Sequence, residues 1–235
     1  IELTQEIFSG YLLKQGGTFL GTTNKGSPVV FSRDGKKIDQ SNQIIEGYHQ
    51  LGLDGLIIIG GDGSMQILQN LANKGNLNIV AIPKTIDNDV GATDSSIGFD
   101  TAVQVATQAL DNLHSTAVSH SRSMILEVMG RDAGHIALSA GIAGGADVIL
   151  IPEIKYTLNG IINKLDEMKK RNVKHSLIVV AEAVKKENGE KVIHKFKDGQ
   201  IRLGGIGEYI ANEIMTKTDV ECRVTTLGHV QRGAP

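Results

Sequence analysis

The sequence has a single cysteine, only four prolines and no long apolar run. With Cys222 alone the chain cannot form an internal disulfide, which favours a reducing compartment. No apolar segment approaches the roughly 18 residues that a membrane-spanning helix needs. The first residues are polar and lack the apolar centre of a signal peptide. We therefore expect a cytoplasmic protein with no membrane partner.

Charge of either sign is also not in excess, since the formal net charge is −2 at pH 7. This balance gives no electrostatic reason to expect a nucleic-acid partner. The 235 residues, 40% of them hydrophobic and 21% charged, describe a globular chain that can form one large domain or two lobes. The 28 glycines predict tight turns between strands and helices near ligands.

Short apolar runs alternate with helical patterns along the chain. Runs without polar alternation occupy residues 56–59, 79–82, 124–128, 148–151 and 177–180. Such runs are typical of parallel strands that are covered on both faces. Helical spacing from Ile38 to Leu51 precedes the first run, and residues 192–194 and 200–202 predict a small hairpin. The predicted fold class is α/β, with mostly parallel sheets and helices on both faces.

The polar stretch at residues 83–89 follows one of these runs, so it lies at the carboxyl end of a predicted strand. Open α/β sheets carry their chemistry on such loops. Two carboxylates, Asp87 and Asp89, stand beside the hydroxyl of Thr85 and the cation of Lys84. This set can hold a divalent metal, accept a proton from an alcohol and bind phosphate. An ordinary polar turn is the alternative, because Asp, Asn and Pro are common turn residues.

A second polar stretch, residues 60–64, joins an apolar run to a helical pattern through the sequence GGDGS. Glycines let a phosphate approach the backbone, and the following helix offers free N–H groups and a favourable dipole. Asp62 supplies the kind of oxygen ligand that Mg²⁺ prefers. The turn resembles the glycine–aspartate–glycine turn of NAD kinases and diacylglycerol kinases, which implies phosphoryl transfer without naming the acceptor. A plain tight turn is the alternative.

With these two stretches in view, the chain resembles the phosphofructokinase family. Further matches in the family's order are residues 119–122 (SHSR), 127–131 (EVMGR), Glu182 and 227–233 (LGHVQRG). The resemblance covers nearly the whole chain and implies two similar three-layer α/β/α lobes. Residues 1–98 would form an incomplete donor-binding lobe for ATP and Mg²⁺. Residues 99–235 would form the sugar-phosphate-binding lobe, with the chain returning toward the donor lobe near residue 230.

The resemblance also implies catalytic and donor-binding roles. Asp87 would accept the proton of the sugar 1-hydroxyl, and Asp89 would support charge and metal beside it. Thr85 would bind near the transferred phosphoryl group, where Arg131 would stabilise the spreading negative charge. The donor would be bound by Gly61, Asp62, Gly63, Ser64, Lys84 and Lys25, with Mg²⁺ on Asp62.

The acceptor side is implied in the same way. The sugar would be held by Thr85, Asp87, Met129, Gly130, Arg131 and Glu182. The 6-phosphate would be bound by Arg122, Arg223, His229 and Arg232. In this family the arginines at the positions of Arg122 and Arg223 reach in from a neighbouring subunit, so a homo-oligomer, dimer or tetramer, with shared sugar-phosphate sites is implied. Taken singly, each of these residues is also compatible with a purely structural role, as a solvated surface charge or a core side chain.

Members of this family use either ATP or pyrophosphate as the phosphoryl donor, so the resemblance leaves both open here. ATP-using members of the family typically have glycine at the position of Gly63, where pyrophosphate-using members carry aspartate. A carboxylate there would crowd and repel the α-phosphate of a nucleotide. Lys84 points the other way, because ATP-using bacterial members typically have glycine at its position. We give Gly63 more weight and predict ATP.

Together these assignments predict a 6-phosphofructokinase, the glycolytic kinase that transfers the γ-phosphoryl group of ATP to the 1-hydroxyl of fructose 6-phosphate. The product would be fructose 1,6-bisphosphate. The alternatives are a pyrophosphate-dependent phosphotransferase and a non-catalytic sugar-phosphate-binding regulatory subunit. The family's first glycine-rich loop and its C-terminal segment have no match here, so a polypeptide without them is expected to be inactive by itself. Oligomer size and allosteric effectors are left open.

Overall fold

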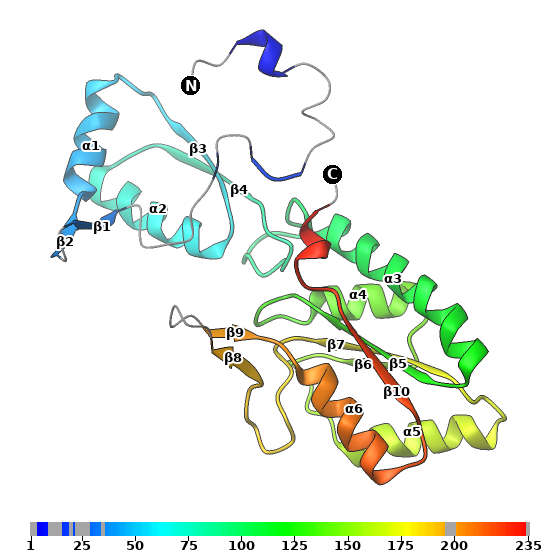
Figure 1. Cartoon of the computed structure of the whole chain (residues 1–235). Coiled ribbons are helices and arrows are strands. Elements are labelled where there is room, and N and C mark those ends of the chain that lie inside the picture. Colours follow the sequence, from blue (N-terminus) through cyan, green and yellow to red (C-terminus); the bar gives the residue numbers. More distant parts are fainter. Residues whose placement is uncertain are drawn as a thin grey trace. The chain divides into compact units, whose positions relative to one another are not determined.

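The computed structural model describes residues 4–8, 16–18, 21, 29–33, 36–195 and 201–233. The chain divides into two compact units, which are described separately (Figure 1). Unit 1 consists of Ile1–Gly16, Ile86–Asn88 and Gly98–Pro235, and unit 2 consists of Gly17–Thr85 and Asp89–Ile97. The chain therefore passes from unit 2 into unit 1 and back within the polar stretch at residues 83–89. Which unit binds which substrate stays a prediction.

Unit 1 is built on a four-stranded parallel sheet with the strand order β10-β5-β7-β6. Its strands are β5 (Ser123–Val128), β6 (Val148–Leu150), β7 (Ser176–Ala181) and β10 (Cys222–Thr226). The two central strands, β5 and β7, are buried at every residue. They lie between other strands and under helices, which explains why both read as nearly continuous apolar runs.

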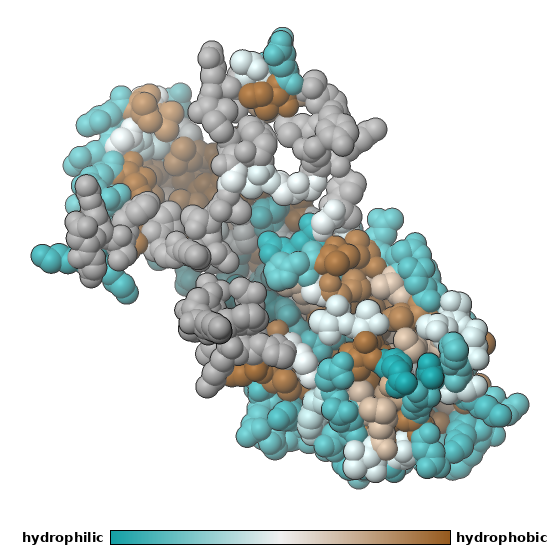
Figure 2. Space-filling view, viewed as in Figure 1, coloured by the Kyte–Doolittle hydropathy of each residue, from teal (hydrophilic) through white to brown (hydrophobic). Residues whose placement is uncertain are grey.

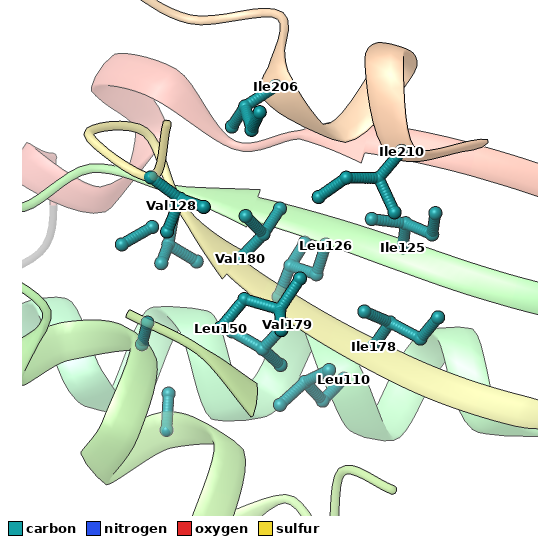
Figure 3. Close-up of a cluster of buried hydrophobic side chains, with 14 of the residues drawn as sticks. Leu110, Ile125, Leu126, Val128, Leu150, Ile178, Val179, Val180, Ile206 and Ile210 are labelled. Atoms are coloured by element: carbon teal, nitrogen blue, oxygen red, sulfur yellow. The ribbon is translucent and has the colours of Figure 1, made fainter. Parts of the chain in front are cut away.

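Helices cover both faces of this sheet. They are α3 (Phe99–His120), α4 (His135–Ala143), α5 (Leu158–Lys170) and α6 (Ile206–Lys217). Figure 3 shows Leu110 of α3 on one side of the strands and Ile206 and Ile210 of α6 on the other. Two alanines of α3, Ala102 and Ala106, have no exposed surface, so this long helix packs closely. One continuous apolar core therefore fixes the strand ends of unit 1.

Unit 2 contains a two-stranded parallel sheet of β3 (Leu56–Gly60) and β4 (Ile79–Pro83). Two helices, α1 (Ser41–Gln50) and α2 (Asp62–Gly75), contribute to a small core of buried residues formed by Tyr48, Leu71, Ala72 and Leu77. On the other face of the sheet, Ile57 and Val80 are 73% and 64% exposed. Hydrophobic surface over β3 is visible in Figure 2. In the described part of unit 2, helices therefore cover only one face of the strands.

The segment before α1 differs from the sequence-based expectation. Helical spacing from Ile38 predicted a helix, but Lys36–Asp39 forms strand β2, which pairs antiparallel with β1 (Val30–Arg33). Ile38 is exposed in this hairpin, so its apolar side chain was a misleading signal. The helix begins instead at Ser41, whose amide donates to the Asp39 carboxylate at 2.8 Å.

The other elements named from the sequence are confirmed, including the hairpin of β8 (Ile193–Lys195) and β9 (Ile201–Leu203). Two short 3₁₀ helices, Gln5–Phe8 and Gly228–Arg232, complete the described elements. The α/β fold class with parallel sheets is likewise confirmed. Among the described residues, no helix is long and apolar enough to cross a membrane.

Candidate active site

A tight turn follows β5 at the carboxyl end of the unit 1 sheet. Gly130 has φ of +144°, and a Cβ there would lie 2.5 Å from the carbonyl oxygen of Ala133, so only glycine fits. The amide of Ala133 donates to the Gly130 carbonyl at 2.9 Å and closes the turn. Arg131 adopts a left-handed φ of +52° and leaves its side chain 66% exposed. Its guanidinium is therefore accessible to an anionic ligand.

Glu182 follows β7 and stabilises this turn through hydrogen bonds. Its amide donates to the Val128 carbonyl at 2.9 Å, which extends the pairing of β5 and β7 by one residue. Its Oε1 accepts the backbone amide of Arg131 at 3.0 Å. The β5 turn and the end of β7 are thus joined through a carboxylate, and a loss of that carboxylate would release the Arg131 backbone.

The pKa of Glu182 is raised to about 7, first because the side chain is taken out of water. The amides of Arg131 and Gly130 oppose this shift, and the charges of Asp87 and Glu127 add to it. Asp87 therefore lies within electrostatic range of Glu182. The structure brings three predicted acceptor-site residues, Asp87, Arg131 and Glu182, to the same end of one sheet.

The segment Ile86–Asn88 explains how Asp87 reaches that place. Although the flanking residues belong to unit 2, Ile86 packs against the main apolar core of unit 1. Asn88 then turns the chain with a left-handed φ of +53°. Asp87 is half-buried between these two anchors. Its carboxylate is thus attached to unit 1, whereas Thr85 and Asp89 group with unit 2.

Glu127 received no role from the sequence, yet it is only 2% exposed. Its two carboxylate oxygens accept the amides of Gly205 and Gly207 at 2.9 and 2.8 Å, where α6 begins. Its carbonyl accepts the amide of Leu227 just after β10. A buried carboxylate needs such partners, and the helix dipole favours it. Glu127 therefore ties β5, α6 and β10 together behind the Arg131 turn; an acidic residue inside an apolar strand was its only signal.

Arg122 and Arg223 lie at the opposite, amino end of the same sheet. Because Ser123 pairs with Cys222 in parallel register, Arg122 stands beside Glu221. The Nε of Arg122 donates to Glu221 Oε2 at 2.8 Å, and Arg223 also pairs with this carboxylate. The strand between Arg122 and the Arg131 turn spans about 20 Å at roughly 3.3 Å per residue. Within one chain these two arginines do not join the group around Arg131.

The other predicted 6-phosphate residues, His229 and Arg232, follow β10 at the carboxyl end of the sheet. Both are exposed and lie in the 3₁₀ helix Gly228–Arg232. The hydrogen bond from Leu227 to Glu127 fixes the start of this segment relative to β5. The predicted phosphate ligands are therefore divided between two ends of one sheet, two residues at each.

In unit 2, the predicted donor residues gather where β3 and β4 end. The Lys84 amide donates to the Gly60 carbonyl at 2.7 Å, and a Cβ on Gly61 would lie 3.5 Å from the Cβ of Thr85. A Cβ on Gly63 would meet nothing within 4 Å. The glycine-rich turn and the Lys84–Thr85 segment are therefore neighbours, with open space beside Gly63. Lys25 lies outside the described residues.

Asp62 is the first residue of α2 and is exposed. The first N–H groups of a helix lack intrahelical partners and suit a phosphate. No cluster of three or more His, Cys, Asp or Glu side chains capable of holding a metal occurs in the described ranges. Mg²⁺ commonly binds one or two carboxylates together with substrate phosphates and water. Asp62 fits such an ion as one ligand among those that a phosphate donor brings.

Comparison with known proteins identifies the family. A family model described as Phosphofructokinase matches residues 1–235, so the chain belongs to the phosphofructokinase family. It is 58% identical over 224 residues to ATP-dependent 6-phosphofructokinase 1 of Synechocystis sp., and 60% identical over 223 residues to ATP-dependent 6-phosphofructokinase 1 of Nostoc sp.. These matches cover 95% and 94% of this chain but 62% of each relative. The chain thus spans about three fifths of the length of these curated relatives.

The fold comparison agrees with the sequence comparison. A phosphofructokinase structure from Saccharomyces cerevisiae matches with a TM-score of 0.73 at 28% identity. The match covers 94% of this chain and 30% of that chain. The resemblance inferred from the Thr85–Asp89 and Met129–Arg131 motifs is therefore confirmed at the level of family and fold.

Proposed function

We propose that this chain serves the reaction of an ATP-dependent 6-phosphofructokinase, which phosphorylates the 1-hydroxyl of fructose 6-phosphate in glycolysis. The observation that carries the proposal is the grouping of Asp87, Arg131 and Glu182 at one end of the unit 1 sheet. The names of relatives about 60% identical to this chain support the same reaction. A glycolytic reaction also fits a cytoplasmic location.

In the proposed mechanism, Asp87 takes the proton of the sugar 1-hydroxyl. The oxygen then attacks the γ-phosphorus, an O–P bond forms, and the bond between that phosphorus and the departing ADP oxygen breaks. Arg131 stabilises the negative charge on the transferring group, because its guanidinium is exposed while its backbone is held by Glu182. Bound Mg²⁺ would neutralise donor phosphate charge, with Asp62 as its protein ligand.

The donor proposal depends on Gly63 and Lys84. Open space beside Gly63 leaves room for a nucleotide phosphate, and the relatives with the highest identity reported above carry ATP-dependent names. Lys84 is exposed at the end of β4 and adjacent to the glycine-rich turn, which keeps pyrophosphate as the second candidate donor. A lysine accommodates either donor as a point charge.

The proposal includes a homo-oligomer with shared acceptor sites. Arg122 and Arg223 lie at the amino end of the sheet, about 20 Å along the strands from the Arg131 turn. A phosphate held by these arginines therefore belongs to a different site from the one served by Arg131 in the same chain. A second subunit whose acceptor site faces this end would use them, which supports the implied sharing of sites.

The first test is a coupled assay of the full-length protein with fructose 6-phosphate and Mg²⁺, comparing ATP with pyrophosphate. We expect turnover with ATP and none with pyrophosphate. Turnover with pyrophosphate alone would reverse the weight given to Gly63 over Lys84. Absence of turnover with both donors, in a protein that still binds fructose 6-phosphate, would instead support a regulatory subunit.

A further inference from the structure

Glu221 occupies the centre of the cluster at the amino end of the unit 1 sheet. Its Oε2 accepts the Nε–H of Arg122 at 2.8 Å, and its Oε1 accepts an Nη2–H of Arg223. The hydrogen bond from Arg122 comes first among the causes that lower the pKa of Glu221, and the charges of both arginines add to it. One ionised carboxylate therefore bridges two cations that would otherwise repel each other.

Backbone hydrogen bonds of the sheet fix the positions of Arg122 and Glu221 relative to the strands. The Ser123 amide donates to the Glu221 carbonyl at 2.9 Å, and the Ser176 amide donates to the Arg122 carbonyl at 3.2 Å. On the other side, Nη1 of Arg223 donates to the carbonyl of Cys222 at 2.9 Å, and Cys222 itself is buried. The three charged side chains thus start from strand ends with a set register. This distinguishes them from an ordinary surface ion pair between mobile side chains.

The contacts of the guanidinium groups leave binding capacity unused. Each guanidinium carries five N–H donors in a planar fork. Within the part of the chain that the structure describes, Arg122 donates its Nε–H to Glu221 and makes no hydrogen bond through its two Nη groups, while Arg223 donates one N–H each to Glu221 and Cys222. Arg122 and Arg223 keep 30% and 51% of their side-chain surface exposed. The pair can therefore accept an anion while it remains attached to Glu221.

We propose that Glu221 is a positioning residue that holds Arg122 and Arg223 together as one phosphate-binding pair. The inference rests on the proposed function, in which these arginines bind the 6-phosphate of a sugar bound by a partner subunit. Glu221 acts here as outer carboxylates do for metal ligands: it orients the groups that touch the ligand without touching it. A guanidinium already held along one side loses less freedom when a phosphate binds to its remaining N–H groups.

The direction in which phosphate affinity changes when Glu221 is removed distinguishes a positioning role from a simple charge effect. If Glu221 acted only as a nearby negative charge, removing it would tighten phosphate binding, because like charges repel. A positioning role predicts the opposite, since Arg122 and Arg223 would separate and lose their shared orientation. Weaker phosphate binding after loss of a negative charge is therefore the diagnostic result.

The test uses the full-length protein with Glu221→Gln and Glu221→Ala. We expect the KM for fructose 6-phosphate to rise about threefold in the first variant, which keeps one acceptor, and about tenfold in the second. The kcat should stay within about twofold of the parent, and the Kd for inorganic phosphate, measured by calorimetry, should rise in parallel. Unchanged or tighter phosphate binding in both variants would overturn the proposal.

Glu213→Gln is the matched control, because Glu213 also lies in an ion pair, with Lys217 on α6, but contacts neither arginine. Its KM and phosphate affinity should stay unchanged. Thermal unfolding of all variants checks that Glu221 does not act through the stability of the sheet. A smaller folded fraction would lower the apparent kcat and leave KM unchanged, which is the opposite of the pattern expected for a positioning role of Glu221.

Arginine variants separate failure of this inference from failure of the proposed function. If Arg122→Ala and Arg223→Ala leave phosphate binding unchanged, the assignment of these arginines to the 6-phosphate is wrong. If they weaken binding while Glu221→Ala does not, only the positioning role is wrong. With both roles present, adding Glu221→Ala to Arg122→Ala should cost less than it does in the parent protein, because the two residues act through one pair.

Discussion

The two units use similar apolar strands in different ways. In unit 1, β5 and β7 are buried along their whole length, between helices on both faces. In unit 2, β3 alternates between buried and exposed residues, so that Ile58 is 8% exposed while Ile57 is 73% exposed. Parallel strands are usually covered on both faces. An apolar run therefore identifies a strand but does not establish that both of its faces are covered.

The difference extends to the residues that carry chemistry. Around the unit 1 sheet, carboxylates are held by backbone amides, as Glu127 is by Gly205 and Gly207, and Glu182 is by Arg131. At the carboxyl ends of the unit 2 strands, Asp62 and Ser64 are exposed at the start of α2, and Gly63 faces open space. The predicted acceptor residues of unit 1 are thus held in place by backbone hydrogen bonds, whereas the predicted donor residues of unit 2 lie exposed beside open space.

The largest expected effect tests the unit 1 side of this comparison. Asp87→Ser in the full-length protein should lower kcat by about 10²–10⁴-fold, because the proposed base is lost, while KM for fructose 6-phosphate changes little. Steady-state kinetics with ATP measures both. Asp166→Ser, at an exposed position on α5, is the control and should retain parent activity. A kcat for Asp87→Ser within tenfold of the parent would exclude Asp87 as the base.

The next prediction tests the open space in unit 2. Gly63→Asp should lower kcat/KM for ATP by at least about tenfold, because a carboxylate in the first turn of α2 repels the nucleotide phosphates. The fold should tolerate it, since a Cβ at Gly63 meets no atom within 4 Å and an acidic residue suits a helix N-terminus. Equal Tm values with unequal ATP kinetics would support donor exclusion; a lowered Tm would show that the site is not open.

A third prediction compares a buried and an exposed carboxylate. Glu127→Ala should destabilise unit 1 by about 2–4 kcal/mol, because two amides at the start of α6 lose their acceptor. Asp39→Ala in unit 2 should cost much less, since Asp39 is exposed and the Ser41 amide that donates to it can bind water instead. Denaturant unfolding of both variants gives the comparison. Equal costs would contradict the greater dependence of unit 1 on buried polar contacts.

The smallest effect concerns pH. Burial raises the pKa of Glu182 from 4.5 to about 7, so the folded chain binds more protons than the unfolded chain between these values. The free energy of unfolding should therefore fall as pH rises from about 4.5 to 7. Glu182→Gln should flatten this part of the profile, measured as Tm against pH. An unchanged slope would show that other groups dominate it.

Much of the unit 1 site was predictable from residue order. Apolar runs followed by polar turns predicted that the site residues lie at the carboxyl ends of strands. The Met129–Arg131 and Thr85–Asp89 motifs indicated the family. Other features depended on pairing between distant segments. Glu127 meets the amides at the start of α6, and Glu221 meets Arg122, only because α6 and β10 pack beside β5, and no local sequence pattern indicates those contacts. The hairpin before α1 was missed because Ile38 fits helical spacing while lying exposed in a strand.

By itself, the sequence determined the alternation of strands and helices, the family, and the residue types that the proposed phosphoryl transfer would use, since these depend on local periodicity and short motifs. Only the tertiary structure decided that Asp87 groups with unit 1, because Ile86 packs into a core formed by residues far along the chain. It also decided that Arg122 and Arg223 stand at the opposite end of the sheet from Arg131. Strand direction and register set that separation, and both arise from hydrogen bonds between segments about a hundred residues apart.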